Sequence, residues 1–325
     1  MNSLRRLLVA ALAGIGALAA APAALAQAWP ARPIRLVVPF PPGAGTDTVA
    51  RFVAQKLSES MAATIVVENR TGAGGAIGAA EVAKADPDGY TLLFVASPFT
   101  TVAAASKQAG YDPVQQFVPV APIAVGPLAF VVHPDVPAAT MREFVEYARR
   151  NPGKLNYGSA GPGSVNHLAL ELFKARTGTD VAHVPYRGIA DATKDLLGGQ
   201  LQAMTASIPA TLPLAAEKRV RVLAVTGERR IAQLPDVPSW QEQGVPDANV
   251  VNYWGIVAPV GTPRDAVAKL NAAVQKVLAQ PDVKARLERE GAELVPGAPE
   301  RLGALIERDL AGWRRLIAEA RLTFE

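Results

Sequence analysis

The sequence contains no cysteine and only three histidines, and these shortages exclude several kinds of chemistry. Without cysteine the chain has no disulfide and no thiol nucleophile, so its hydrophobic core alone must stabilise the fold. The histidines, His133, His167 and His183, lie far apart and lack the spacing of metal ligands. We therefore expect no bound metal, no cofactor and no thiol catalysis.

An excess of charge of one sign is also lacking. Lys and Arg number 33, Asp and Glu number 29, the formal net charge is +4, and no basic run is present. Nucleic acid is therefore not an expected partner. After the N-terminal segment, no stretch is long and apolar enough to span a bilayer. With 325 residues, the chain is long enough for two domains.

The N-terminal 28 residues have the three parts of a secretory signal peptide. Two arginines precede an apolar run over residues 7–20, and small residues then frame cleavage after Ala26 or Ala28. The alternative, an uncleaved membrane anchor, needs about 20 apolar residues, and the run is shorter. Cleavage removes two positive charges and no acid, which lowers the net charge from +4 to +2. We predict export to the periplasm, with Gln27 or Trp29 as the first residue.

Short runs rich in Val, Ile and Leu alternate with helical patterns along the mature chain. We expect strands at residues 34–38, 64–67, 90–95, 128–133, 181–184, 222–225 and 254–258. Continuous apolar strands with helices between them predict an α/β fold whose sheets are mostly parallel and buried on both faces.

Several helices have recognisable first residues. Thr140 and Glu143 form a capping box, and Thr262 is expected to cap a helix whose first turn contains Pro263. Near the C-terminus, apolar residues from Leu302 to Ile317 recur along one face of a long helix. These stripes are expected to pack in the core.

The domain organisation follows from the lack of a repeat or a low-complexity linker. Two domains joined by strands that cross between them fit better than two domains on one tether. We place the crossing near residues 126–132 and the return near residues 244–254. Domain 1 then comprises residues 29–127 with 250–325, and domain 2 comprises residues 128–249.

The first loop, residues 39–47, follows a strand and opens a helix that Thr46 or Asp47 can cap. Its glycines let the backbone approach a ligand, and the amides at a helix N-terminus bind anions. An ordinary strand-to-helix turn explains the sequence equally well. The second loop, residues 70–78, lacks both the dinucleotide and the P-loop fingerprint, and we expect a structural turn, with a role in the ligand cleft as the alternative.

The third loop, residues 157–167, resembles the first loop because it also follows a strand and opens a helix. It has glycines and hydroxyls ahead of a helix that Ser164 can cap. A serine hydrolase is the alternative, because His167 lies one turn beyond Ser164. The Gly-x-Ser-x-Gly elbow is absent, since Tyr157 stands two residues before Ser159, and no orienting acid is evident. A capped turn is the favoured interpretation.

The fourth loop, residues 184–189, carries Tyr186, which can wall a pocket, and Arg187, which is expected to be a solvated charge. Hydroxyls at other strand ends, from Ser97, Thr100 and Ser207, can add hydrogen bonds.

These segments together resemble the substrate-binding proteins of tripartite tricarboxylate transporters, the Bug family of periplasmic receptors. The matching stretches lie at residues 29–34, 38–43, 67–75, 87–92, 157–159, 183–188, 223–225, 234–238 and 254–259. The resemblance implies a type II periplasmic-binding-protein fold, with two α/β domains, a cleft between them and hinge strands. It further implies that backbone groups and hydroxyls of the first and third loops hold a ligand carboxylate. Ala44 and Gln202 depart from the family pattern, so roles at these two positions are not carried over.

We therefore expect a monomeric binding receptor that hands a small carboxylate to membrane transporter subunits, with no catalytic residue. The expected ligand contacts are Phe40, Pro42, Gly43, Ala44, Gly45, Thr46, Asp47, Ser97, Thr100, Ser159, Gly161, Gly163, Ser164, His167, Tyr186 and Ser207. The alternatives are a ligand sensor for a signalling partner and a secreted serine hydrolase.

The position of the two glycine loops yields a sharper expectation. The first and third loops should face each other across the cleft, one in each domain. A bulky residue at Gly45 or Gly163 should block the ligand and leave the fold intact, and Arg187 should matter less. Replacing Ser159 or Ser164 by Ala should affect binding only.

Overall fold

The computed structural model describes residues 29–325 except 44, 107, 246–249, 290 and 325, so the predicted signal peptide and Ala44 lie outside the described residues. The chain divides into two compact units, residues 1–32 and residues 33–325, and the account below concerns the second. Among the described residues, no helix combines the length and the apolar character needed to cross a membrane.

The first of two sheets combines three parallel strands with two antiparallel ones. Its spatial order is β2 (Ile65–Asn69), β1 (Ile34–Val38), β3 (Thr91–Ala96), β9 (Val251–Pro259) and the first part of β4 (Phe117–Val132). β1 is parallel to β2 and β3, whereas β9 is antiparallel to both β3 and β4. The short β10 (Glu293–Leu294) also pairs with β4.

The second sheet is built on the last five residues of β4. Its members are β7 (Ala203–Ser207), β5 (Asn156–Ser159), β6 (Ala182–Pro185) and β8 (Arg221–Val225). β5 is parallel to β6 and β7, and β4 is antiparallel to β7 and β8. The same strand β4 therefore belongs to both sheets, and it changes partner from β9 to β7 between Pro127 and Leu128.

The expectation of mostly parallel sheets is correct for three strands in each sheet and wrong for β8 and β10, which pair antiparallel with β4, and for β4 and β9 themselves. These two strands pair with each other along nine register positions. β4 runs from the first sheet into the second, and β9 runs back into the first. Because the two strands lie side by side, they are antiparallel.

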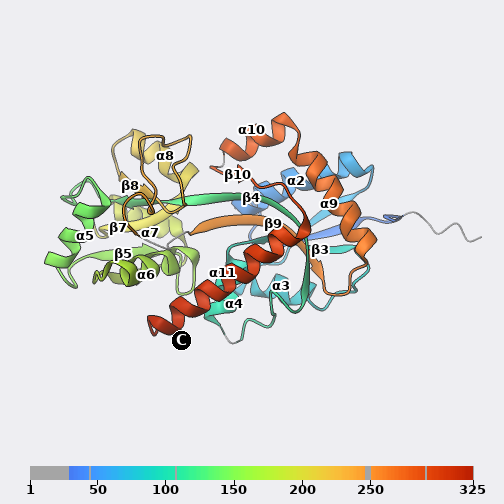
Figure 1. Cartoon of the computed structure of the whole chain (residues 1–325), viewed down its shortest axis with the longest axis horizontal. Helices are drawn as coiled ribbons and strands as arrows, with labels where there is room; N and C mark the ends of the chain where they lie inside the picture. The colour runs from blue at the N-terminus through green and yellow to red at the C-terminus, as the bar shows by residue number, and fades with distance from the viewer. Residues whose placement is uncertain (1–28, 44, 107, 246–249, 290, 325) are drawn as a thin grey trace, which may run out of the picture. The chain divides into compact units, whose positions relative to one another are not determined.

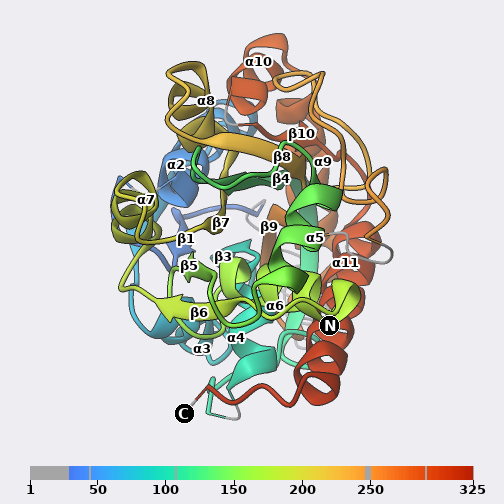
Figure 2. The same ribbon diagram turned by 90° about the vertical axis from the view of Figure 1, so that its left-hand side faces the viewer.

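The sheets are covered by helices, seen in Figure 1 and, from the side of α5 to α8, in Figure 2. They are α2 (Gly45–Met61), α3 (Ala76–Val82), α4 (Pro98–Ala105), α5 (Met141–Arg150), α6 (Val165–Thr177), α7 (Ile189–Leu197), α8 (Ile208–Ala216), α9 (Arg264–Leu278), α10 (Pro281–Arg289) and α11 (Pro299–Glu319), with a 3₁₀ turn η1 (Ala73–Gly75).

Two of the predicted caps are confirmed. Thr140 Oγ1 accepts the Glu143 amide at the start of α5, and Ser164 caps α6. The cap at Thr262 is wrong, because its hydroxyl donates to the carbonyl of Pro259 and the N-cap residue of α9 is Pro263.

The C-terminal helix α11 connects the cores of the two sheets. Its Leu302 and Ile306 belong to the core of the first sheet, while Trp313 and Leu316 belong to that of the second. The helix also packs against α4 and β4. The predicted apolar stripe of the C-terminal helix is thus confirmed, and it serves two cores.

Candidate functional site

The carboxyl ends of the parallel strands define one edge in each sheet. In the first sheet, β1, β2 and β3 lead into the first loop, the second loop and Ser97. In the second sheet, β5 and β6 lead into the third and fourth loops, and β7 ends at Ser207. Loops at the carboxyl ends of parallel strands are the usual place for ligands in α/β sheets.

The strand registers place these two edges next to each other. Ala96, the last residue of β3, pairs with Trp254, and Trp254 pairs with Ala124 of β4. Ser207, the last residue of β7, pairs with Leu128, also of β4. Four residues of one strand, about 13 Å at the usual rise, therefore separate the edges, and both carboxyl ends point toward this junction.

The first loop is shaped by the buried carboxylate of Asp47, which is 1 % exposed. Its oxygens accept from the Gly43 amide at 2.8 Å, from Arg51 Nε at 2.9 Å and from Asn69 Nδ2 at 2.7 Å. Burial alone would raise the pKa of Asp47, but the bonds from Arg51, Asn69 and Gly43 outweigh it and lower the pKa. Asp47 is thus fully engaged in holding the loop and is not a helix cap.

The groups that the first loop leaves to solvent are mainly backbone. Pro42, Gly43 and Gly45 are exposed, and Phe40 and Thr46 are half-buried. Thr46 Oγ1 accepts the indole N–H of Trp254 at 3.4 Å, which ties the loop to β9.

The second loop supports the first as a structural turn. A small cavity of about 10 Å³ lies between it and the first loop. A Cβ at Gly78 would lie 2.9 Å from the Cβ of Pro39 and 2.8 Å from the Arg70 carbonyl oxygen. Only glycine permits this close approach.

The third loop folds around its own hydroxyls. Ser159 is 0 % exposed, accepts from the Gly161 amide at 3.0 Å and lies 2.7 Å from His183 Nε2. Ser164 Oγ donates to the Gly161 carbonyl at 2.7 Å and accepts the His167 amide at 3.3 Å.

The hydrolase alternative required a hydrogen bond between the imidazole of His167 and Ser164, and the described residues show the imidazole bonded elsewhere. His167 Nδ1 instead accepts the amide N–H of Gly163 at 3.1 Å. The partner of the serine is His183, which the sequence did not single out, because it reaches Ser159 only through the parallel pairing of β5 with β6.

The remaining predicted contacts divide into buried and accessible groups. Ser97, at 1 % exposed, bonds to β9 through Val251 O and Asn252 Oδ1, and Thr100, at 0 %, donates to Asp309 Oδ2. Both hydroxyls are thus satisfied inside the protein. Tyr186 is half-buried, and Ser207 is exposed.

Tyr186 is fixed from behind by a carboxylate. Its hydroxyl donates to Asp195 Oδ2 at 2.6 Å. Burial and then this bond raise the pKa of Tyr186 to about 12. The ring is therefore held in a neutral form beside the third loop, where the Tyr186 amide bonds to the Ser159 carbonyl.

The third loop also contacts the helix that follows the first edge. A Cβ at Gly163 would lie 2.9 Å from the Cβ of Ala105, the last residue of α4, and the φ of Gly163 is +73°. The expectation that a bulky residue at Gly163 leaves the fold intact is therefore wrong, since backbone and contact would both be strained. At Gly45 no atom lies within 4 Å of an added Cβ.

A family model for the tripartite tricarboxylate transporter family receptor matches residues 49–322. The chain belongs to this receptor family.

Relatives of the receptor cover nearly the whole chain. Protein BugT of Bordetella pertussis is 33 % identical over 321 residues, 98 % of each chain. A structure of an R. palustris protein with adipate is 35 % identical, has a TM-score of 0.80 and covers 91 % of this chain and 99 % of its own. MatC of Rhodopseudomonas palustris with bound malate is 33 % identical, with a TM-score of 0.76 and coverage of 89 % and 100 %. The receptor therefore has the periplasmic-binding-protein fold.

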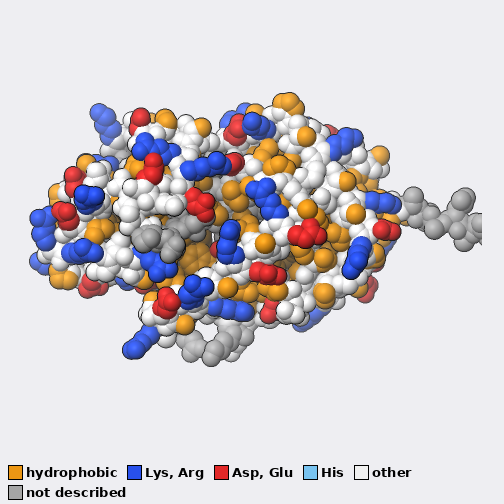
Figure 3. All heavy atoms as spheres, in the orientation of Figure 1, with side chains coloured by type: hydrophobic (Ala, Val, Ile, Leu, Met, Phe, Trp, Pro, Cys, Tyr) orange, Lys and Arg blue, Asp and Glu red, His pale blue; other side chains and the backbone are white. Residues whose placement is uncertain are grey.

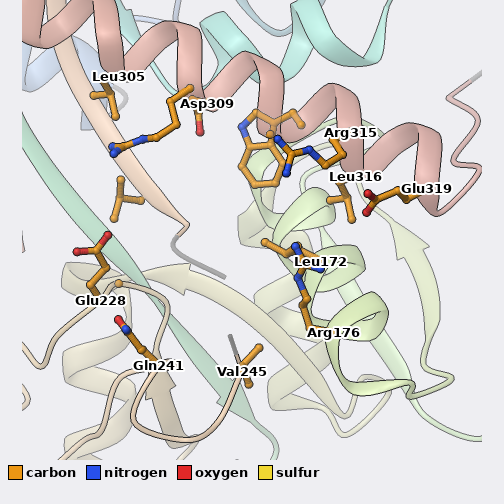
Figure 4. A pocket seen from close by; sticks show the side chains of 15 residues that line it. Leu172, Arg176, Glu228, Gln241, Val245, Leu305, Asp309, Arg315, Leu316 and Glu319 are labelled. Atoms are coloured by element: carbon orange, nitrogen blue, oxygen red, sulfur yellow. The ribbon is translucent and has the colours of Figure 1, made fainter. Parts of the chain in front are cut away.

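A cavity of about 720 Å³ lies beside α11, apart from the predicted contacts of the receptor (Figure 4). Its charged lining consists of Arg176, Arg308, Arg315, Glu228, Asp309 and Glu319. The two signs are balanced, and Lys and Arg are likewise interspersed with Asp and Glu over the face in Figure 3. Such a lining favours neither anion nor cation, and we assign this cavity no ligand.

Proposed function

We propose that this receptor captures a small carboxylate between the two sheet edges and delivers it to membrane subunits of a tripartite tricarboxylate-type transporter. One observation carries the proposal. The strand registers direct two glycine-containing loops, each followed by a helix N-terminus, toward the same short segment of β4. The adipate and malate bound to relatives support a carboxylate as the ligand class.

The proposed contacts lie along the two edges, and their hydrogen bonds come from the hydroxyls and from amides not already bonded within the loops, since the amides of Gly43, Gly161 and Gly163 donate to Asp47, Ser159 and His167. The first edge contributes Phe40, Pro42, Gly43, Gly45 and Thr46, and the second edge contributes Gly161, Gly163, Ser164, Tyr186 and Ser207. Hydrogen bonds to a charged group contribute about 1.5–3 kcal/mol each and helix ends about 0.3–1. A few of them suffice for micromolar binding, about −8 kcal/mol.

Arginine is not part of the proposed clamp. Arg51 is bonded to Asp47 and to Asn69 Oδ1, and Arg187 is exposed. Each guanidinium is thus engaged in holding the first loop or surrounded by water.

We propose the domain boundaries on the same strand. Residues 29–127 with 250–325 form one domain and residues 128–249 the other. The support is the change of partner on β4 between Pro127 and Leu128. β4 and β9 are then the hinge strands, and closure brings the two edges together around the ligand.

The receptor is further proposed to act in the periplasm after removal of its signal peptide. The charged, apolar and small-residue parts of residues 1–28 support this. Intact-mass analysis of exported protein is expected to show Gln27 or Trp29 at the N-terminus. A full-length membrane-bound product would contradict it.

A contact between Ser159 and His183 favours the hydrolase alternative, but the Ser159 hydroxyl is not accessible to a substrate. Ser159 is 0 % exposed, and the nearby Glu171 carboxylate accepts from Tyr157 and Lys174. We expect the parent protein to hydrolyse no ester or amide. Ser159→Ala and Ser164→Ala should change only the affinity for the ligand.

Calorimetry against a set of small acids tests the function. The set comprises adipate, malate, a tricarboxylate, an acidic amino acid and a nicotinate-like acid, and adipamide is the neutral control matched to adipate. At least one acid is expected to bind with micromolar affinity and to raise the melting temperature. Adipamide should bind far more weakly if adipate binds. Binding by none of the acids, or equal binding of the amide, would refute the proposal.

A further inference from the structure

Three aromatic rings form a stack directly behind the third loop. The ring centroids of His167 and His183 are 3.9 Å apart at 13°, and those of His183 and Tyr157 are 4.9 Å apart at 22°. Phe324, near the C-terminus, meets the His167 ring edge-on at 5.5 Å. Two of the three histidines of the chain are therefore in contact, on α6 and β6.

The hydrogen bond at His167 requires a particular protonation state. The amide N–H of Gly163 donates to Nδ1 of His167 at 3.1 Å, so Nδ1 must carry a lone pair and no proton. A backbone N–H can only donate a hydrogen bond and cannot accept one. A protonated His167 would place two N–H groups against each other and break the bond.

Ser159 differs from Gly163 in this respect. Its hydroxyl accepts from the Gly161 amide and has two further neighbours, His183 Nε2 at 2.7 Å and the Gly161 carbonyl at 3.2 Å. The hydroxyl can donate to either neighbour, so it accommodates a neutral or a protonated His183. The proton-sensitive bond of the loop is therefore the one at His167.

The surroundings oppose a positive charge on the pair. Burial lowers the pKa of His167, and burial together with His167 lowers the pKa of His183 to about 4. Glu171 of α6 favours the proton, but its Oε1 already accepts from Tyr157 of β5 and from Lys174 of α6. Lys174 disfavours the proton, as does the positive end of α6, in whose first turn His167 lies.

We propose that neutral His167 positions the Gly161–Ser164 segment for binding, and that a proton taken up by the His167–His183 pair at acid pH releases this segment and the ligand. The ligand part rests on the proposed function, whereas the loop part does not. The stacked pair thus makes binding sensitive to the acidity of the surrounding compartment.

The loop part is tested on the parent protein without ligand. Amide NMR of the mature chain follows Gly163 while the histidine ring nitrogens are titrated from about pH 7.5 to pH 4. The Gly163 amide signal is expected to shift together with His167, below the ordinary histidine pKa of 6.5. A Gly163 signal that stays constant while His167 takes up its proton would overturn the proposal.

The ligand part uses His167→Asn, because the Asn side-chain oxygen takes the place of Nδ1 as an acceptor and does not titrate. We measure the dissociation constant of one acid from the panel at about pH 7.5 and pH 5, with His133→Asn as the control outside the stack. One linked proton weakens binding by up to about tenfold per pH unit. The ratio of the two constants is expected to be larger for the parent and for His133→Asn than for His167→Asn, by up to about tenfold for each pH unit that pH 5 lies below the pKa of His167.

The comparison within one acid cancels the titration of the ligand itself. Equal ratios for the parent and His167→Asn would refute the release of ligand by protonation. Binding of no acid at either pH would instead refute the proposed function, and the NMR titration would still decide the loop part. If His167→Asn does not fold, the parent titration alone decides.

Discussion

Gly163 and Gly45 occupy similar places, each in a loop that leads into a helix, yet only one of them depends on being glycine. Gly163 has a φ of +73° and lies against Ala105, whereas Gly45 begins α2 with open space around it. From the sequence alone, Gly45 and Gly163 are expected to tolerate a side chain equally well. The difference depends on a contact between residues far apart in the chain.

We predict opposite tolerance at these two glycines. Gly163→Ala is expected to lower the free energy of unfolding by about 1–3 kcal/mol, because a Cβ is disfavoured at this φ and overpacks against Ala105. Gly45→Ala should change it by less than about 0.5 kcal/mol. Urea unfolding of both variants measures this, and similar losses at the two positions would contradict the assignment of strain to Gly163.

The sequence predicted hydrogen bonds between residues that are close together in the chain, but it did not predict bonds between residues that are far apart in the chain. The Ser164 cap follows from spacing along one helix start, and it was predictable. Ser97 directly follows β3 as expected, but the partners of Asp47, Ser97 and Thr100, which are Asn69, Asn252 and Asp309, come from other elements. The contact of Ser159 with His183 likewise needs the register of β5 against β6.

At the scale of elements, the main omission of the sequence reading is the first part of β4. Pro119, Pro122 and Pro127 argue against a strand, since proline lacks the ladder N–H. The structure accommodates two of them at irregularities, where the register with β9 shifts between Pro119 and Ala121 and between Pro122 and Ala124. The strand therefore extends from Phe117 to Val132, and the expected residues 128–133 are only its end.

Asp309 connects α11 to α4 through the Thr100 hydroxyl. Burial raises the pKa of Asp309 to about 6, above the ordinary 3.8 of the unfolded chain. Between these two values the folded state binds more protons than the unfolded state, so this carboxyl lowers stability as the pH rises from about 4 to 6.

We therefore predict that Asp309→Asn gains stability relative to the parent as the pH rises through this window. The amide oxygen still accepts from Thr100 and carries no charge. Urea unfolding at about pH 4, 6 and 8 measures the difference, with Glu307→Gln, an exposed acid on the same helix, as the control. A difference for Asp309→Asn that does not grow between pH 4 and 6 would show that the buried charge has no such effect.

At the scale of the whole molecule, the site depends on two strands that connect distant parts of the chain. The first edge uses residues before 100 and β9 after 250, and the second edge uses residues between 156 and 207. Periodicity predicts neither set as neighbours. The family resemblance implies a cleft between the two edges, and the registers on β4 support this proposal.

If β4 and β9 are hinges, a ligand that touches both edges must bias the receptor toward a closed state. Gly163 of the third loop lies against Ala105 of α4, while α11, β4 and β9 connect the two sheets with or without ligand. A bridging carboxylate adds hydrogen bonds from both sides, so closure should become the dominant state when the ligand is bound.

The absence of cysteine allows a clean measurement of this closure. Spin labels on Gln55→Cys of α2 and Arg187→Cys, both exposed and outside the proposed contacts, report the separation of the two edges by pulsed electron resonance. Saturating amounts of an acid that binds should shift the distribution to shorter and narrower distances. Labels on Arg187→Cys and Ala210→Cys of α8, both in the proposed second domain and exposed, are the matched control and should not move. If the cross-edge distribution is unchanged while calorimetry shows binding, the ligand occupies a preformed site, and β4 and β9 are rigid connections instead of hinges.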